Sequence, residues 1–128
     1  KEDLEKRMTS FEKSVGEVTG STADVLDKMY KIYGEWDKEL NIVYKKLLVK
    51  VEKLEKTCGK KCEGAKASLV KSQRAWVQFK DNEKEFIENQ QGNTSLGVIM
   101  STDTRIDLIK DRTLSLAYYY DLVSGATD

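Results

Sequence analysis

The sequence of 128 residues contains no histidine and no proline. Without histidine, the usual general base for a serine or cysteine nucleophile is missing. A four-coordinate zinc site is disfavoured as well, because Cys58 and Cys62 are the only cysteines and no imidazole can join them. No glycine-rich phosphate-binding loop is present either. These absences predict a protein that is not an enzyme and that uses no metal or other cofactor.

Long apolar runs and an excess of one charge are also missing. No apolar stretch approaches the roughly 18 to 20 residues that a membrane-spanning helix needs, so we expect no transmembrane segment. Lysine plus arginine and aspartate plus glutamate both number 22, which gives a net charge of zero. This balance gives no reason to expect binding to nucleic acid or to a membrane.

The charges are nevertheless unevenly distributed along the chain. Residues 45–66 hold eight lysines against three glutamates, whereas residues 92–128 hold three basic residues against five aspartates. One end of the folded protein should therefore be basic. A run of like charges at the tip of a helical rod is usually solvated, and we interpret the lysine-rich segment in that way rather than as a binding patch.

The absence of proline, together with 34% charged and 39% hydrophobic residues, favours long uninterrupted helices. Helical periodicity covers residues 2–15, a long stretch after Ser21 (an expected N-cap), residues 65–90, and a last stretch after the turn "QQGNTSLG". The expected fold is all-α: an elongated antiparallel bundle of three long helices plus a short N-terminal helix. We expect residues 1–128 to form one domain, with residues 16–20 as a hinge at most.

The second predicted helix carries the clearest packing pattern. Apolar side chains recur at seven-residue spacing over several turns, as in a helix that packs against neighbours along its whole length. They are Leu26, Tyr33, Leu40, Leu47 and Leu54. Trp36 and Tyr44 on this helix, and Trp76 on the next, fall on apolar stripes and are predicted to be core aromatics.

The cysteines lie in the predicted turn "TCGKKCEG" with a C-x-x-x-C spacing, which differs from that of a redox C-x-x-C motif. Two interpretations remain open: a local disulfide between Cys58 and Cys62 that fixes the turn, or two free thiols. We favour the disulfide, which would place the protein in an oxidising compartment.

Three consecutive tyrosines near the C-terminus point in different directions from one helix, so at least one of them must be exposed. Tyrosine is enriched at binding surfaces, which makes Tyr118 and Tyr119 a candidate binding surface. A frayed terminal helix that rests on the first helix explains the same residues equally well.

Three segments together resemble a known family. They are "WDKELNIVYKKLL" (36–48), "LVKSQRAWVQFKD" (69–81) and "TDTRIDLI" (102–109). The chain resembles the lysozyme inhibitor LprI-type domain of exported bacterial proteins, over about residues 36–120. The matching positions are Leu40, Asn41, Tyr44, Leu69, Gln73, Arg74, Trp76, Asp81, Thr102 and Arg105. Family members often carry cysteines near positions 84–85 and before the last helix, and this chain has none there, so the family's disulfide pairing does not transfer.

Four polar residues of these segments lie on or beside the apolar stripes of three helices: Asn41, Gln73, Asp81 and Arg105. Polar groups at such positions must find partners when they are buried, and their pairing specifies helix register. We predict that the four form an internal polar seam rather than a binding site. Arg105 is expected to pair with a carboxylate of the preceding helix, Asp81 in the first place and Glu85 in the second.

The resemblance implies a non-catalytic bacterial protein that binds another protein, with lysozyme as the implied target. It also implies a periplasmic or secreted location, with a lipid anchor in some members. A basic target would favour an acidic surface, and residues 92–128 are the candidate for it. An alternative function is a structural or adaptor module of the cell envelope with another partner.

Overall fold

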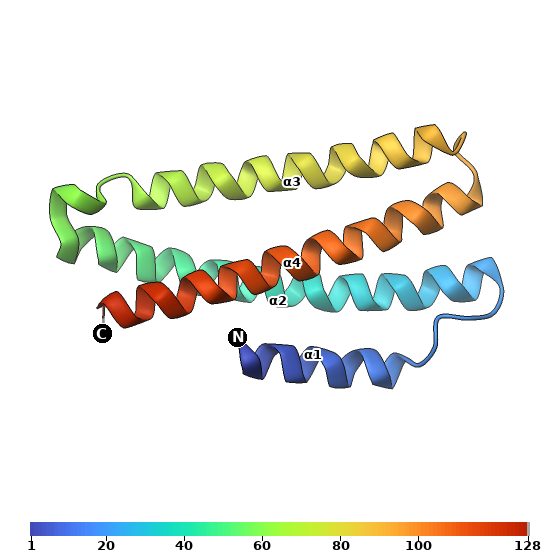
Figure 1. Cartoon of the computed structure of the whole chain (residues 1–128), viewed down its shortest axis with the longest axis horizontal. Coiled ribbons are helices and arrows are strands. Elements are labelled where there is room, and N and C mark those ends of the chain that lie inside the picture. The colour runs from blue at the N-terminus through green and yellow to red at the C-terminus, as the bar shows by residue number, and fades with distance from the viewer. Residues whose placement is uncertain (128) are drawn as a thin grey trace.

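The computed structural model describes residues 1–127, with side chains up to residue 125, and contains four α-helices. They are α1 (Glu2–Val15), α2 (Thr22–Cys58), α3 (Ala65–Gln90) and α4 (Ser95–Thr127), with a short 3-10 helix, η1 (Gly59–Cys62), between α2 and α3. No strand occurs among residues 1–127. Successive helices run in opposite directions and form an elongated bundle (Figure 1). The prediction of an all-α bundle with three long helices and one short helix is confirmed.

The ends of the helices follow from local sequence. The Ser21 side chain accepts a hydrogen bond of 3.2 Å from the Asp24 N–H, so Ser21 caps α2 as expected. The α2 helix ends where Gly59 adopts a φ of 74°, a left-handed conformation that favours glycine. The turn between α3 and α4 uses two more left-handed residues, Gly92 and Asn93. Because proline is absent, no helix is interrupted between these ends.

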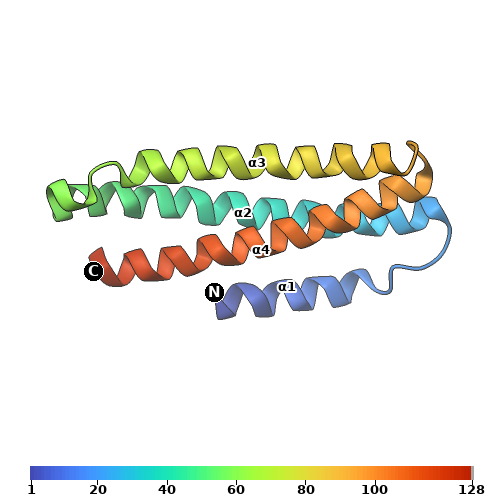
Figure 2. The ribbon, with the colours of Figure 1, turned by 45° about the horizontal axis from the view of Figure 1, so that its top comes forward.

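The core lies mainly between α2 and α4, which pack along most of their length (Figure 2). Its buried apolar side chains come chiefly from these two helices: Met29, Ile32, Trp36, Leu40, Leu47, Val51, Ile106, Ile109, Leu116 and Ala117. The third helix contributes one buried residue in the described structure, Gln73. Of the predicted core aromatics, Trp36 is buried, while Tyr44 and Trp76 are half-buried and pack against the core.

Small polar residues of α4 line its contact with the rest of the bundle. Ser101, Thr102 and Thr113 are completely buried. Their hydroxyls donate hydrogen bonds to backbone carbonyls of α4 itself. Thr102 Oγ1 donates to the Val98 carbonyl at 2.7 Å, and Thr113 Oγ1 donates to the Ile109 carbonyl at 2.6 Å. Because each hydroxyl has its partner in its own helix, it can be buried at little cost. The small side chains allow neighbouring helices to come close.

The start of α4 also comes very close to the end of α3. A Cβ atom added to Gly97 would lie 2.9 Å from the Gln91 Cβ, closer than two carbon atoms can pack. Glycine at this position therefore permits the tight α3–α4 connection. By contrast, an added Cβ at Gly34, on an exposed face of α2, would meet nothing within 4 Å. The close approach of chain segments thus explains Gly97 but leaves Gly34 without a structural reason.

The short helix α1 runs beside α2 and α4 over part of their length (Figures 1 and 2). It buries Leu4 and Met8 in the shared core. The guanidinium of Arg7 donates two hydrogen bonds to the carboxylate of Glu39, at 2.7 and 3.2 Å. Glu12 accepts a hydrogen bond of 2.9 Å from the indole N–H of Trp36. Polar contacts therefore orient α1 on the bundle in addition to apolar ones.

Candidate functional site

Gln73 is the predicted seam residue that lies in the interior. Its side chain is 7% exposed, and its amide oxygen accepts a hydrogen bond of 2.8 Å from Nε of Arg112 on α4. Arg112 also donates to the Ser72 hydroxyl at 3.3 Å. Burial lowers the pKa of Arg112 from its ordinary value. Sequence reasoning missed Arg112, although its position seven residues after Arg105 on the same helix face was an available signal.

Asn41 and Asp81 lie outside this seam, which corrects the expectation that all four polar residues are internal. Both side chains are exposed. Asn41 donates a hydrogen bond to the Asp37 carbonyl of its own helix at 3.0 Å. Each of the two comes directly after a residue that faces a neighbouring helix. Successive side chains of a helix point about 100° apart, so the next side chain is turned toward solvent.

Arg105 stacks on an aromatic ring instead of pairing with Asp81. Its guanidinium carbon lies 5.0 Å from the centroid of the Tyr33 ring, and its Nε atom has no hydrogen-bond partner among the described residues. Lys80 donates a hydrogen bond of 2.6 Å to the Tyr33 hydroxyl and lies 5.3 Å from the centroid of Trp76. The three long helices are thus joined here by two cations around Tyr33, through cation–π contacts rather than an ion pair.

The disulfide is present at the tip of the bundle. Cys58 and Cys62 are bonded across η1, with their Cα atoms 5.6 Å apart. The bond closes a loop of a few residues, so it mainly fixes the turn that presents Lys60 and Lys61 to solvent. Neither cysteine is available as a nucleophile or a metal ligand in this state.

The first prediction concerns these thiols in the protein recovered from its own compartment. Alkylation without a reductant should add no mass to the intact protein, because both sulfur atoms are engaged. Alkylation after reduction and unfolding should add two labels, one for each cysteine. Labelling of both cysteines before reduction would show that the native protein carries free thiols.

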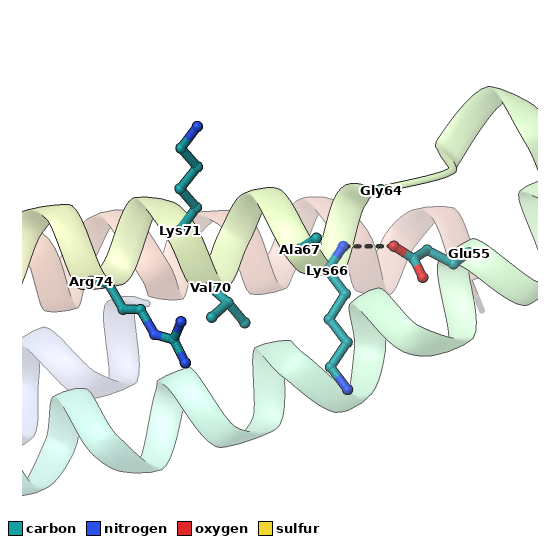
Figure 3. Close-up of a pocket in the computed structure, with 7 residues that line it drawn as sticks. All are labelled: Glu55, Gly64, Lys66, Ala67, Val70, Lys71 and Arg74. Atoms are coloured by element: carbon teal, nitrogen blue, oxygen red, sulfur yellow. Dashed lines mark hydrogen bonds between the residues drawn. The ribbon is translucent and has the colours of Figure 1, made fainter.

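An open groove of about 610 Å³ lies beside the tip, between the end of α2 and the start of α3 (Figure 3). Glu55 reaches across from α2 and accepts a hydrogen bond of 2.7 Å from the Lys66 N–H, so it caps α3. The amine of Lys66 pairs with Glu52, which lowers the pKa of that carboxyl group. Lys71 and Arg74 are exposed along the same side of the groove. The groove is therefore cationic at its α3 wall.

Among the residues that the structure describes, no group of three histidine, cysteine, aspartate or glutamate side chains could hold a metal ion.

The charges separate along the length of the bundle. Residues 10–40 and 76–111 together hold fourteen acidic residues against eight basic ones, and we call them the acidic half. They form the end that carries the α1–α2 and α3–α4 connections (Figure 1). Residues 41–75, the lysine-rich half, hold ten basic residues against three glutamates. A net charge of zero thus hides a strong dipole along the molecule.

A cleft in the acidic half lies between α3 and the start of α4. Its walls include Asp81, Glu85, Glu88 and Arg105. Asp81 and Glu85 are exposed, whereas Glu88 is drawn inward by Lys84 at 3.1 Å and by the Ser101 hydroxyl at 3.2 Å. The exposed carboxylates make this cleft a candidate contact for a cationic side chain.

The comparison with protein families decides the relationship. The model of the family described as lysozyme inhibitor LprI matches residues 16–116. This chain belongs to the LprI family. The match confirms the resemblance drawn from the short motifs of α2, α3 and α4, and it leaves α1 outside. Neither a curated protein nor a solved structure matches the chain.

The description of the LprI family names an inhibitor and names no catalytic activity. Among the described residues of this LprI-family chain, no helix is long and apolar enough to cross a membrane. The predicted tyrosine surface lies near the end of α4, outside the matched range: Tyr118 and Tyr119 are 50% and 41% exposed, with ring centroids 6.1 Å apart. Leu122 beside them is also exposed.

Proposed function

We propose that this LprI-family protein is an exported bacterial protein without catalytic activity that binds and inhibits lysozyme. The family match over residues 16–116 is the observation that carries the proposal. The Cys58–Cys62 disulfide supports export, because such bonds persist in oxidising compartments. A periplasmic or secreted location follows, and a lipid anchor in the full-length protein is compatible with it.

The acidic half is the surface that we propose for lysozyme, which is a basic enzyme. Its fourteen acidic residues come from all four helices and from the α1–α2 connection. Electrostatic complementarity accelerates association and orients the partners. Within this half, the exposed carboxylates of Asp81 and Glu85 at the α3–α4 cleft are the proposed contact for a lysine or arginine of the enzyme. The contact differs from the earlier expectation for residues 92–128, because most of these charges lie in other segments.

The second prediction tests inhibition directly. The purified protein should slow the lysis of bacterial cell walls by lysozyme at about stoichiometric amounts. Inhibition should weaken as salt is added, since the Debye length falls from about 10 Å at 0.1 M ionic strength to about 3 Å at 1 M. The measurement is the decrease in turbidity of a cell-wall suspension across a titration of the protein.

Matched charge variants locate the contact. Asp81→Lys/Glu85→Lys should weaken inhibition by at least about tenfold, because it replaces two attractive charges with repulsive ones. Glu2→Lys/Glu5→Lys makes the same change in net charge on an exposed part of α1, away from the acidic half, and should retain most of the inhibition. Equal effects of the two variants would exclude the α3–α4 cleft as the contact. No slowing of lysis at a large molar excess of the parent protein would exclude lysozyme inhibition.

A second candidate function is an envelope adaptor that uses Tyr118 and Tyr119. The exposure of both rings, together with Leu122, supports it. Capture of a partner from periplasmic extract by the parent protein, but not by a Tyr118→Ser/Tyr119→Ser variant, would favour the adaptor. Lysozyme should be included as a named competitor, because its capture through the acidic half would favour the inhibitor instead.

A further inference from the structure

The outward side of α3 is exposed along most of the helix, which contributes one buried residue although it is 26 residues long. Exposed residues recur there at a spacing of four and three residues, as they do along a helix that packs against a further helix. We call this set the α3 stripe, and its members are Ser68, Ser72, Ala75, Phe79, Asn82 and Phe86. Phe79 and Phe86 are 50% and 62% exposed. Two aromatic rings one heptad apart therefore face solvent in the single chain.

The exposed charges of α3 are arranged symmetrically about its middle. Four charged side chains of this helix are exposed: Lys71, Arg74, Asp81 and Glu85. The two basic residues lie seven and four residues before Gln78, and the two acidic residues lie three and seven residues after it. The sign of the exposed charge thus reverses at Gln78.

Charged residues of the neighbouring helices leave this asymmetry in place. Before Gln78, α3 is contacted by Glu52 and Glu55 of α2 and by Arg112 of α4. With these three included, that part of α3 has four basic residues against two acidic ones. After Gln78, Arg105 of α4 lines the cleft beside α3. With Arg105 included, this second part has four acidic residues against three basic ones.

The sizes of the side chains in the α3 stripe reverse at the same place. Ser68, Ser72 and Ala75 are small and precede Gln78, whereas both phenylalanines follow it. If a second copy of α3 lies antiparallel with Gln78 opposite Gln78, Phe86 of one copy falls between Ser68 and Ser72 of the other. A large side chain is then placed beside two small ones, as in the packing of knobs into holes.

The same alignment pairs the charges. Lys71 and Glu85 lie seven residues on either side of Gln78, so each Lys71 is opposite a Glu85 of the other copy. A parallel alignment would instead place each residue opposite its own copy, with like charges together. Self-complementarity about a single point is what a two-fold symmetric contact requires. A different partner protein would not require this symmetry of α3.

We propose that two copies of this chain associate through the α3 stripe, antiparallel about a two-fold axis near Gln78. The acidic half of each copy then lies beside the lysine-rich half of the other. Glu85 is also part of the proposed lysozyme contact, so a second copy and lysozyme compete for it. Self-association is measured without lysozyme, and the two proposals can therefore fail independently.

The size of the contact sets its strength. Residues 68–86 extend over roughly 27 Å, because a helix rises about 1.5 Å per residue. One helix from each copy covers less than the roughly 800 Å² per partner of a standard interface, which is typical of weak complexes. We expect a dissociation constant on the order of 10 to 100 µM, so monomer and dimer should exchange.

The third prediction is a sedimentation equilibrium experiment with the full chain at low salt. The protein should be monomeric at about 1 µM and mostly dimeric at about 500 µM. Phe79→Ser/Phe86→Ser should stay monomeric, whereas Tyr118→Ser/Tyr119→Ser, at an exposed aromatic pair of α4, should dimerise like the parent protein. A parent protein that is monomeric at the highest concentration would overturn the proposal. An equal loss in both variants would also overturn it.

A charge swap tests the antiparallel arrangement. Lys71→Glu and Glu85→Lys should each raise the dissociation constant by at least about tenfold, because like charges then meet at two symmetry-related places. Lys71→Glu/Glu85→Lys should dimerise like the parent protein, since each pair is restored with reversed sign at the same net charge. An equimolar mixture of the two single variants should associate for the same reason.

Circular dichroism should show that the single variants keep the helical fold, because both positions are exposed. Loss of the dimer in the single variants without recovery in the double variant would overturn the antiparallel pairing. Unchanged dimerisation of both single variants would overturn it as well.

Discussion

Replacement of Arg7 by methionine is expected to lower the free energy of unfolding by about 2 to 3 kcal/mol, because it leaves a buried carboxylate without its cation. Glu39 is 5% exposed, and Arg7 meets it with two hydrogen bonds. The hydrogen bond to Glu39 also raises the pKa of Arg7. Breaking a fully buried pair typically costs about 3 to 5 kcal/mol. We expect less here, because the Arg7 side chain is 54% exposed and α1 can undock to rehydrate Glu39.

The measurement is chemical denaturation of three variants, together with limited proteolysis of the segment between α1 and α2. Arg7→Met should be cleaved faster than the parent protein. Residues 16–20 are exposed but held between two docked helices, and undocking of α1 frees their backbone to enter a protease site. Arg7→Met/Glu39→Met should recover most of the stability, because no charge is then stranded. Lys6→Met, at an exposed neighbouring position, should change stability by about 0.5 kcal/mol or less. A double variant as unstable as Arg7→Met would contradict the explanation by a stranded charge.

The helices could be predicted from the sequence because their signals are local. Ser21 caps α2 through a residue three positions away, and glycines at the turns adopt conformations that few other residues tolerate. The apolar repeat of α2 predicted a helix packed along its length. Local rules of this kind were sufficient for the four helices and their order.

The polar contacts could not be predicted in the same way. Whether a residue beside an apolar stripe is buried depends on how each helix is rotated in the bundle, and the sequence does not state that rotation. Gln73 is turned inward and meets Arg112, whereas Asp81, expected to meet Arg105, is turned outward. Tyr33 occupies the place beside Arg105 that the prediction gave to a carboxylate.

The surface charge, like the helices and their polar contacts, was predictable only in part. A lysine-rich run was evident at residues 45–66 and was predicted to be solvated, and six of its eight lysines are exposed. The exposed apolar residues between the lysines, Ile42 and Val49, were visible only once burial was known, because the heptad pattern of α2 does not state which of its faces is covered. The acidic half combines two separate segments of the chain, so it could not be predicted from any single run of acidic residues.

Replacement of Trp36 by alanine is expected to cause the largest loss of stability, because Trp36 lies where α1, α2 and α4 meet. Its side chain is 3% exposed, and its indole N–H donates to Glu12 of α1. Lys110 of α4 lies 5.7 Å from the ring centroid and pairs with Glu12 at 3.3 Å. Trp36→Ala should therefore lower the free energy of unfolding by about 3 to 5 kcal/mol, through the lost apolar contact and the cavity that remains.

Two further variants divide this loss into its causes. Trp36→Phe keeps much of the apolar volume but removes the indole N–H, and because Glu12 keeps Lys110 as a partner, the hydrogen bond should account for only about 1 kcal/mol. Trp76→Ala, at a half-buried tryptophan of α3, should cost clearly less than Trp36→Ala. Denaturation curves of the three variants give the comparison. If Trp76→Ala proved as damaging as Trp36→Ala, the cohesion of the bundle would depend on α3 as much as on the contact between α2 and α4.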